Sequence, residues 1–364
     1  TSGQFVFTIL PMKPAPEKSA ESMSAQQRYR DNFARHVLGL ARYLQSQTMH
    51  ILCEHYGHQN LRLNFEPYIA LVGDHGVRLS DIAETLAVSR QSANQTANII
   101  EAAGYVTRTS DPCDGRARLL VLTAAGEQLR SDGTRVVASL QSQIGQLVSP
   151  KDLATSIDTL ITLTHSLKLP LVAGNAGRLQ TGAELGGLLP RLATYIEYRL
   201  MTLTADKGHP GLRLSFGQVL TLIGPGGGSI QRIANTQEVS KQAISAIATE
   251  LEELGYIRRE ADPDDARQLL LKLTARGEAL IADSVASVDT LGKEFADLVG
   301  ARRFGTLCRT IATSYRTLGL EEDIFSHAEN LDVRVLARQL REQLGDSGAQ
   351  QLAHLLLCPQ TKTG

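Results

Sequence analysis

The sequence contains a long internal repeat, and this repeat limits the possible folds more than any other feature. The segment that starts at Leu61-Arg-Leu-Asn-Phe65 aligns without gaps with the segment that starts at Leu212-Arg-Leu-Ser-Phe216, at an offset of 151 residues. About 30 of roughly 69 aligned positions are identical. A unit of this size is too large for a solenoid repeat. We therefore expect a duplicated domain.

The repeat divides the 364-residue chain into five parts, two of which are domains, as expected for this length. A stretch between the repeats is rich in Gly, Ala and Leu and includes Pro170, which indicates a linker. The residues from 324 to 357 have helical periodicity. The expected parts are an N-terminal arm over 1–30, a first domain over 31–168, a linker over 169–187, a second domain over 188–320 and a C-terminal helical extension over 321–364.

Each unit has the residue pattern of a winged helix-turn-helix. In the first unit we expect helices over 33–56, 80–86 and 89–103, a helix capped by Asn64, strands over 105–108 and 118–122 around a turn at 111–115, and two further helices from 123 and 150. In the second unit, Ser215 with Gln218 has the pattern of a capping box. The expected fold class is mainly α with small β-hairpin wings (α+β), in two tandem winged helix-turn-helix domains.

The ordered motifs resemble those of the MarR family of bacterial transcriptional regulators. The first unit carries Ile82-Ala83, Val88-Ser89-Arg90, Gly104-Tyr105-Val106, Asp111-Pro-x-Asp-x-Arg116 and Leu122-Thr-x-x-Gly126. The second unit repeats them as Val239-Ser-Lys241, Gly255-Tyr-Ile257, Asp262-Pro-x-Asp-x-Arg267 and Leu273-Thr-x-x-Gly277. The resemblance implies two winged helices that are joined by long dimerisation-type helices and read a pseudo-palindrome. Because both copies lie in one chain, we expect a monomer that acts as a pseudo-dimer.

The second helix of a helix-turn-helix enters the major groove with its N-terminal residues facing the base edges. Arginine can pair bidentately with guanine, and Asn or Gln with adenine. The residues expected to contact DNA are Ser89, Arg90, Gln91, Ser92, Asn94 and Gln95 in the first unit, and Ser240, Lys241, Gln242 and Ser245 in the second. Since the two sets differ, we expect an asymmetric operator with half-sites about one helical turn apart. The alternative is that these are solvated helix residues.

The wings are expected to add minor-groove contacts. By the resemblance, Arg116 and Arg267 enter the minor groove, where a narrow A·T stretch concentrates negative potential. Asp114 and Asp265 are expected to brace the wings by pairing with an Arg. Because the net charge is −1, a DNA-binding surface would have to be a limited basic patch and not a broadly basic face. Acidic residues outnumber basic ones over 239–272, which disfavours phosphate contact by the second unit.

The family commonly responds to small phenolic or other aromatic ligands, or to oxidants. From this we expect an effector pocket between the first long helix and the groove below the helix-turn-helix, with Tyr43, His50 and Tyr68 as candidate walls. The alternative is that each is an ordinary core or surface residue. To act as an effector, a ligand has only to bind the protein more tightly at one spacing of the two reading helices than at another.

The sequence shows no motif of a catalytic or cofactor site. The loop Gly224-Pro-Gly-Gly-Gly228 lacks the Lys and Ser/Thr of a phosphate-binding loop, and we expect neither an enzyme nor a bound cofactor. His50, Cys53 and Glu54 share a helical face, but the second unit has no matching cluster, so a plain thiol is favoured over a metal or redox site. Cys113 is expected to be exposed at the wing tip. Scattered cysteines and the lack of a membrane-spanning run favour the cytoplasm.

These expectations favour a sequence-specific regulator that binds double-stranded DNA, most simply a repressor released by a small aromatic effector. The rival hypothesis is a module that keeps the fold for ligand or protein-partner binding, with weak or lost DNA binding. A third is that two chains pair through swapped helices. The sequence does not disclose the effector, the operator, the regulated genes or the roles of the terminal segments.

Overall fold

The computed structural model describes residues 24–73, 76–86, 88–169, 182–224, 226–237, 239–262 and 268–320, with the backbone only at 115, 116 and 218. Most of the expected N-terminal arm, much of the expected linker and the whole expected C-terminal extension lie outside these residues. Within them, no helix combines the length and apolar character that a membrane span requires.

The described residues form two modules with the same order of elements. The first module comprises α1 (Ala25–Arg30), α2 (Phe33–Glu54), η2 (Leu63–Phe65), α3 (Glu66–Leu71), β1 (Val77–Arg78), α4 (Leu79–Thr85), α5 (Arg90–Ala102), β2 (Val106–Asp111), β3 (Asp114–Leu122), α6 (Ala124–Leu147) and α7 (Pro150–Ser166). The second comprises α8 (Glu184–Ala205), α9 (Leu214–Leu222), β4 (Gly228–Ser229), α10 (Ile230–Thr236), α11 (Lys241–Glu253), β5 (Ile257–Ala261), β6 (Leu269–Leu273), α12 (Ala275–Val299) and α13 (Ala301–Thr317). Both modules are winged helices with long flanking helices, as the repeat predicted. Helix α8 begins within the range 169–187 expected as linker.

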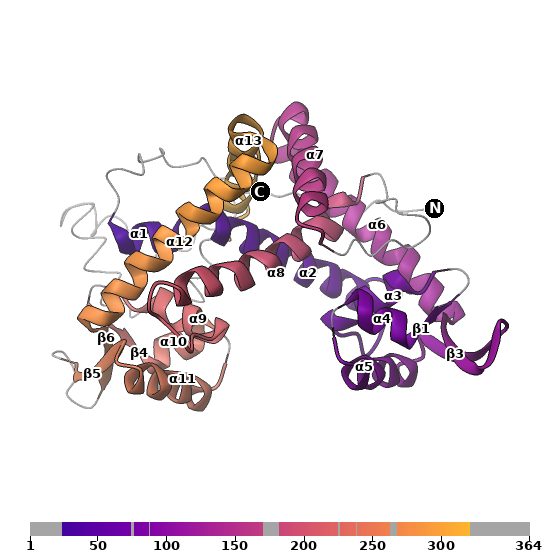
Figure 1. Ribbon diagram of the computed structural model, residues 1–364, viewed down its shortest axis with the longest axis horizontal. Helices are drawn as coiled ribbons and strands as arrows, with labels where there is room; N and C mark the ends of the chain where they lie inside the picture. The colour runs from indigo at the N-terminus through magenta and orange to yellow at the C-terminus, as the bar shows by residue number, and fades with distance from the viewer. Residues whose placement is uncertain are drawn as a thin grey trace, which may run out of the picture.

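The two modules join into one body with two heads (Figure 1). The body consists of α2, α6, α7, α8, α12 and α13. Helices α2 and α8 pack against each other in its middle, and α7 packs against α13 at the apex. Each head is the winged helix of one module, residues 63–122 in the first and 214–273 in the second. The heads lie at the two free ends of the body, well separated from each other.

The hydrophobic core explains why the body is one unit. A single buried cluster contains Leu44 of α2, Leu140 of α6, Leu160 of α7, Leu192 of α8 and Leu291 of α12. It therefore draws on both modules and extends into the first head. The second head has its own buried cluster. Burial of apolar area at this scale is the main force holding the modules together.

The two junctions between the modules differ although they occupy equivalent positions. Where α8 meets α6, Gln141 donates from Nε2 to Oε2 of Glu184 at 2.6 Å and accepts the backbone N–H of Leu185 at 2.8 Å. Where α2 meets α12, the ring of Phe33 lies against Gly292, so that a Cβ there would sit 3.3 Å from the ring. A polar pair at one junction is thus replaced by an aromatic ring on a glycine at the other.

Several helix starts follow the expected capping chemistry. Ser89 caps α5 by accepting the N–H of Ser92, Thr123 caps α6, and Ser149 caps α7 with Pro150 in the first turn. Gly104 has a φ of 85° directly after α5, which is the left-handed conformation predicted for that position.

The expected caps at Asn64 and Ser215 are wrong. The N-cap of α9 is Arg213, which makes no side-chain cap, and Asn64 lies inside η2. In the second module, the backbone N–H of Phe216 donates to the carbonyl of Arg213 at 3.0 Å. That turn buries Phe216, which is 2% exposed. Core burial therefore fixes where this helix begins, in preference to local capping propensity.

Each wing is a three-stranded antiparallel sheet, in the order β1-β3-β2 and β4-β6-β5. The hairpin strands are longer and the first turn is tighter than the sequence indicated, because β2 ends at Asp111 and β3 begins at Asp114. The short third strands, β1 and β4, pair with the side of β3 and β6 opposite the hairpin partner. They tie the start of each helix-turn-helix to its wing.

Candidate nucleic-acid interface

The two reading helices, α5 and α11, lie along the same edge of the molecule. Figure 1 shows them at the outer ends of the two heads, on the side away from α7 and α13. Each follows the short first helix of its helix-turn-helix, α4 or α10, and each is backed by buried side chains: Ala93, Ala97 and Ile100 in α5 and Ile244, Ala248 and Leu251 in α11. Both helices therefore present their opposite faces outward.

Nearly all of the predicted reading residues are exposed. The exposed ones are Ser89, Arg90, Gln91, Ser92, Asn94 and Gln95 in the first head and Ser240, Lys241 and Gln242 in the second. Ser245 is half-buried. The side chain of Arg116 and the whole of Arg267 lie outside the described residues, so the minor-groove contact of the wings stays a prediction.

Some of the reading residues already have structural partners. The hydroxyl of Ser89 accepts the N–H of Ser92 at 3.1 Å, and that of Ser240 accepts the N–H of Ala243 at 3.1 Å. These two hydroxyls fix the first turn of each reading helix. Arg90 and Lys241 are the first residues of the two helices and carry the positive charge nearest to these exposed ends.

An arginine from the wing strand clamps the first reading helix. Arg108 of β2 forms an ion pair with Glu101 and donates from Nη2 to Oδ1 of Asn98 at 2.7 Å and to Oδ1 of Asn94 at 3.1 Å. A planar guanidinium can hold several acceptors at once in this way. The clamp sets the angle between wing and reading helix, and it orients the Asn94 amide.

The second head has the same clamp with different acceptors. Arg259 of β5 pairs with Glu252 and donates from Nη2 to Oγ1 of Thr249 at 3.0 Å and to the carbonyl oxygen of Ser245 at 3.5 Å. The arginine and the glutamate are repeated at the offset of 151, whereas the asparagines are not. The second clamp therefore orients no amide side chain.

The first wing has a brace in which Asp114 takes part, as expected, and in which Asp111 makes the shorter contacts. Arg78 of β1 contacts Oδ2 of Asp111 at 2.7 Å from Nε and 2.5 Å from Nη2, whereas Oδ2 of Asp114 is 3.9 Å away. The backbone N–H of Cys113, and then Arg78, hold the pKa of the Asp111 carboxyl below its ordinary value. Asp111 is thus the main partner and Asp114 the secondary one. Cys113 is exposed, as expected.

The second wing cannot form this brace, because Ser229 stands where the first module has Arg78. Ser229 instead caps α10 by accepting the N–H of Arg232 at 3.2 Å. The basic residues of β5 and β6 pair locally: Arg258 and Lys272 contact Glu260 at 2.5 and 2.7 Å. Lys272 and Arg258 together lower the pKa of the Glu260 carboxyl. Much of the positive charge of this wing is therefore neutralised.

A histidine–carboxylate pair recurs in both modules, with the histidine in the loop between the first long helix and the head. His58 contacts Asp132 of α6 at 2.9 Å, and its equivalent His209 contacts Asp283 of α12 at 2.9 Å. In the second module the other ring nitrogen of His209 lies 3.2 Å from the hydroxyl of Tyr256. Burial raises the pKa of the Asp132 carboxyl, but bonds from His58 and its other donors outweigh this, so that pKa lies below its ordinary value.

The three residues predicted to line an effector pocket have different surroundings. Tyr68 is buried in the core, Tyr43 is half-buried and His50 is exposed. Burial raises the pKa of the Tyr43 hydroxyl. None of them lines either of the two apolar cavities described in the body. Their role as pocket walls stays a prediction.

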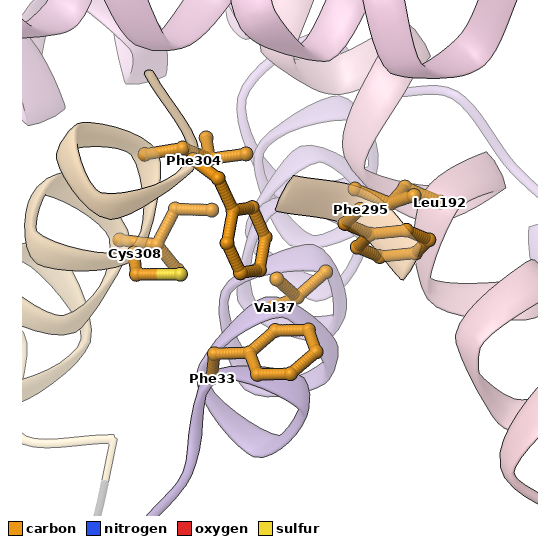
Figure 2. A pocket seen from close by; sticks show the side chains of 8 residues that line it. Phe33, Val37, Leu192, Phe295, Phe304 and Cys308 are labelled. Carbon is orange, nitrogen blue, oxygen red and sulfur yellow. The ribbon is translucent and has the colours of Figure 1, made fainter. Parts of the chain in front are cut away.

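One of these cavities lies among α2, α8, α12 and α13 (Figure 2). Phe33, Phe295 and Phe304 surround it, together with Cys308, whose thiol pKa is raised by burial to about 12. The cavity volume is about 10 Å³, which is about the space of one water and too small for an aromatic effector. No group of three or more His, Cys, Asp or Glu side chains that could hold a metal occurs in the part of the chain that the structure describes.

Sequence reasoning missed the clamp and the histidine pairs, and it named Asp114 but neither Arg78 nor Asp111 for the brace of the first wing. The repeat could have revealed the clamp and the histidine pairs. Arg108 with Glu101 and His58 with Asp132 each recur at the offset of 151, and a charged residue retained in both copies marks a contact that both modules use. The brace has no such signal, because only one module has it.

The comparisons with known proteins agree with this architecture. The family model described as MarR family matches the chain twice, over residues 68–117 and 217–268. Each module therefore contains one MarR-type region. Each matched region covers most of a helix-turn-helix and the start of its wing. These matches indicate a tandem MarR-type transcriptional regulator.

A curated relative is the "Putative transcriptional regulatory protein for hcr operon" of Thauera aromatica, 27% identical over 135 residues, which are 36% of this chain and 80% of the relative. Among solved structures, CouR from Rhodococcus jostii RHA1 bound to p-coumaroyl-CoA is 29% identical, with a TM-score of 0.28, over 38% of this chain and 96% of that chain. A MarR-family transcriptional regulator from Rhodococcus sp. RHA1 is 28% identical, with a TM-score of 0.28, over 37% of this chain and 98% of that chain.

Proposed function

We propose that this MarR-family protein binds double-stranded DNA sequence-specifically and represses transcription, with its two heads on the two half-sites of one asymmetric operator. The observation that carries the proposal is the placement of α5 and α11 on one edge, with their first turns exposed and each helix held by a wing arginine. Two helices on one face can enter successive major grooves of a duplex. A small aromatic effector would act by favouring another spacing of the heads.

The asymmetry of the operator follows from the residues that reach outward. The first head offers Arg90, Gln91 and Gln95, together with an oriented Asn94. The second offers Lys241 and Gln242. Arg discriminates guanine bidentately, whereas Lys acts as a point charge. The first half-site is therefore expected to be read more stringently.

One observation favours the rival function, a MarR-fold module that binds a ligand or a protein partner with weak DNA affinity. Arg258, Arg259 and Lys272 of the second head are each paired with a carboxylate, so they add little to phosphate contact. The salt dependence of DNA binding separates the two functions, because each neutralised phosphate steepens the loss of affinity with salt.

The test uses the full chain and DNA fragments selected from a random library. Fluorescence anisotropy at several salt concentrations should show a steep loss of affinity as salt rises. Arg90→Ala should weaken binding about tenfold or more, and Lys241→Ala should weaken it less. Lys151→Ala, an exposed change on α7 far from the reading edge, is the control and should leave affinity unchanged. Weak, salt-independent binding that Arg90→Ala does not alter would support the rival function.

A further inference from the structure

The two heads join the body through interfaces of different chemistry. The core of the first head is continuous with that of the body, and Val136 of α6 is one of the buried side chains in this shared cluster. In the second module, Ser287 of α12 stands at the equivalent position. Ser287 is fully buried, and its hydroxyl accepts a hydrogen bond from the hydroxyl of Thr204 at 3.2 Å. The buried cluster of the second head is separate from that of the body, and polar side chains lie between them.

Three residues from the start of the first module contact the second head. The side chain of Tyr29 packs against the buried cluster of this head. Arg30 donates from Nη2 to the carbonyl oxygen of Ile223, at the end of α9, at 3.1 Å. Arg35 of α2 donates to the hydroxyl of Thr221 on α9, and its guanidinium lies 5.0 Å from the centre of the Tyr29 ring. We call Tyr29, Arg30 and Arg35 the latch, because they hold the second head from outside its own module.

Helix α1, which carries part of the latch, is fixed to the body. It lies against α12 (Figure 1), where Arg28 pairs with Asp289 at 2.7 Å. Asp31, the C-cap of α1, contacts Nε2 of the buried His36 at 2.6 Å and Nη2 of Arg316 on α13 at 3.2 Å. The latch is therefore anchored on the body, and its contacts with α9 cross to the head.

The first head lacks the residues for the same latch. The position equivalent to Arg35 is Gly186. A Cβ at Gly186 would overlap the side chain of Val137, so α8 packs too closely on α6 to leave room for an arginine. On the head side, Ala70 stands where the second head has Thr221, and it offers no hydroxyl. The latch is thus a feature of one junction that the repeat does not reproduce.

We propose that the second head is the mobile one of the two, and that the latch fixes its position relative to the body. Parts of a chain move relative to each other unless a large hydrophobic interface joins them. The first head shares a core with the body, so it stays in place. Release of the latch lets the second head turn as one unit about its connections to the body. Tyr29 and Arg35 are positioning residues for the second reading helix, and only their effect on DNA rests on the proposed function.

The test measures the distance from each head to the body by double electron–electron resonance, on the full chain without DNA. Spin labels are attached at Glu84→Cys on α4 or at the equivalent Asn235→Cys on α10, each paired with a label at Lys151→Cys on α7. All three positions are exposed, and the natural cysteines are replaced by alanine. With the latch intact, each pair should give one narrow distribution of distances.

Three variants open the latch. Arg35→Met and Tyr29→Ala act from the body side, and Thr221→Ala removes the acceptor of Arg35 from the head side. Each should broaden and shift the distribution of the Asn235 pair and leave that of the Glu84 pair unchanged. Thr221→Ala leaves α1 and α2 intact, so it tests the latch even if the other two variants disturb the fold.

Arg42→Met is the matched control, because Arg42 is an exposed arginine further along the same helix as Arg35. It should change neither distribution. Broadening confined to the Asn235 pair, in a variant whose circular dichroism matches that of the natural chain, supports the latch. An unchanged Asn235 pair in every such variant, or broadening of the Glu84 pair to the same or a greater extent, would overturn it.

DNA affinity separates this inference from the proposed function. The latch variants should bind a fragment with both half-sites about three- to tenfold more weakly, because binding must then order the second head. Their affinity for a fragment with only the first half-site should stay the same. Broadening of the Asn235 pair in a chain that binds no DNA would remove the proposed function and leave the latch intact. Sequence-specific DNA binding by a chain whose Asn235 pair never broadens would do the reverse.

Discussion

Arg108 donates from Nη2 to Oδ1 of Asn94 at 3.1 Å, so a residue of the wing strand β2 fixes the orientation of an amide on α5. An asparagine reads adenine bidentately only when its oxygen and its NH₂ group are both available. The bond from Arg108 occupies one of the two lone pairs of this oxygen, whereas the NH₂ group remains a donor. A bidentate contact of Asn94 with adenine, which its residue type suggested, would have to share the oxygen with Arg108.

Replacing Arg108 with Met should alter base preference in the first half-site. In the natural chain, the base facing Asn94 should be one with a major-groove acceptor, which admits guanine, adenine and thymine and rejects cytosine. In Arg108→Met the released amide should favour adenine about tenfold. The measurement is selection from a library randomised in both half-sites. Arg259→Met is the control, because Arg259 contacts Ser245 only through the backbone carbonyl of that residue. This variant should leave the base preferences of both half-sites unchanged. Identical selected sequences from both proteins would contradict the orienting role.

The brace between Arg78 and Asp111 should matter for DNA affinity, and its loss should also lower stability because the Asp111 side chain is 6% exposed. Arg78→Ser copies the residue of the second module, and it should weaken DNA binding by up to about tenfold because the first wing is no longer held in place. Arg78 pairs with a carboxylate and not with a phosphate. The slope of log affinity against log salt concentration should therefore be the same in Arg78→Ser as in the natural chain. Anisotropy titrations over a range of salt concentrations measure both quantities.

Ser229→Ala changes the matching position of the second module. It removes the N-cap of α10 and should cost about 1 kcal/mol of unfolding free energy, with affinity for the first half-site unchanged. A larger loss of DNA affinity in Ser229→Ala than in Arg78→Ser would show that the brace does not position the first wing.

The histidine–aspartate pairs should differ in their contribution to stability. The side chain of Asp132 is 3% exposed and that of Asp283 is 38% exposed. Asp132→Asn should therefore lower the unfolding free energy by about 2–3 kcal/mol, and Asp283→Asn by about 1 kcal/mol or less. Urea unfolding near neutral pH measures both. Equal losses in the two variants would contradict the role of burial.

The same pair predicts a pH dependence. Because the folded state lowers the pKa of Asp132 below its ordinary value of 3.8, its stabilisation is fully present above that ordinary value. It is lost as pH falls through the lower folded-state pKa. The difference in stability between the natural chain and Asp132→Asn should therefore shrink in strong acid. A difference that is constant from neutral pH to about pH 2 would exclude this linkage.

Two glycines of α6 should respond oppositely to substitution. A Cβ at Gly126 would lie 2.0 Å from the carbonyl oxygen of Tyr105, whereas a Cβ at Gly133 would meet nothing within 4 Å. Gly126→Ala should force the helix away from the wing and cost about 3 kcal/mol or more. Gly133→Ala should stabilise the chain by about 0.5–1 kcal/mol. Thermal unfolding of both variants is the measurement, and a stable Gly126→Ala protein would contradict the close contact.

The repeat made the module architecture predictable, because a gapless match over a winged-helix pattern leaves few folds. The helix starts at Ser89, Thr123 and Ser149 were predictable for a local reason: their capping side chains bond within the same turn. The caps expected at Asn64 and Ser215 failed because burial of an aromatic side chain decides where those helices begin. The start of these helices depends on core residues that are distant in the sequence, and a local residue pattern does not identify them.

The candidate interface was predictable as a set of positions and not as a set of contacts. Exposure of Arg90, Gln91 and Lys241 follows from their place in the first turn of a reading helix. The engagement of Asn94 by Arg108 crosses from helix to strand, and the contact of Arg35 with Thr221 joins residues 186 positions apart. Contacts of this kind between distant residues can be identified only when the fold is known.

The two junctions between the modules affect which halves of the chain can pair with each other. Phe33 fits against Gly292, and Glu184 fits against Gln141, so at this position each half complements the other half and not a copy of itself. A pair of first halves would press the Phe33 ring onto Gln141, and a pair of second halves would leave Glu184 facing Gly292. We therefore expect the two halves to pair with each other in preference to forming a symmetric dimer of either half.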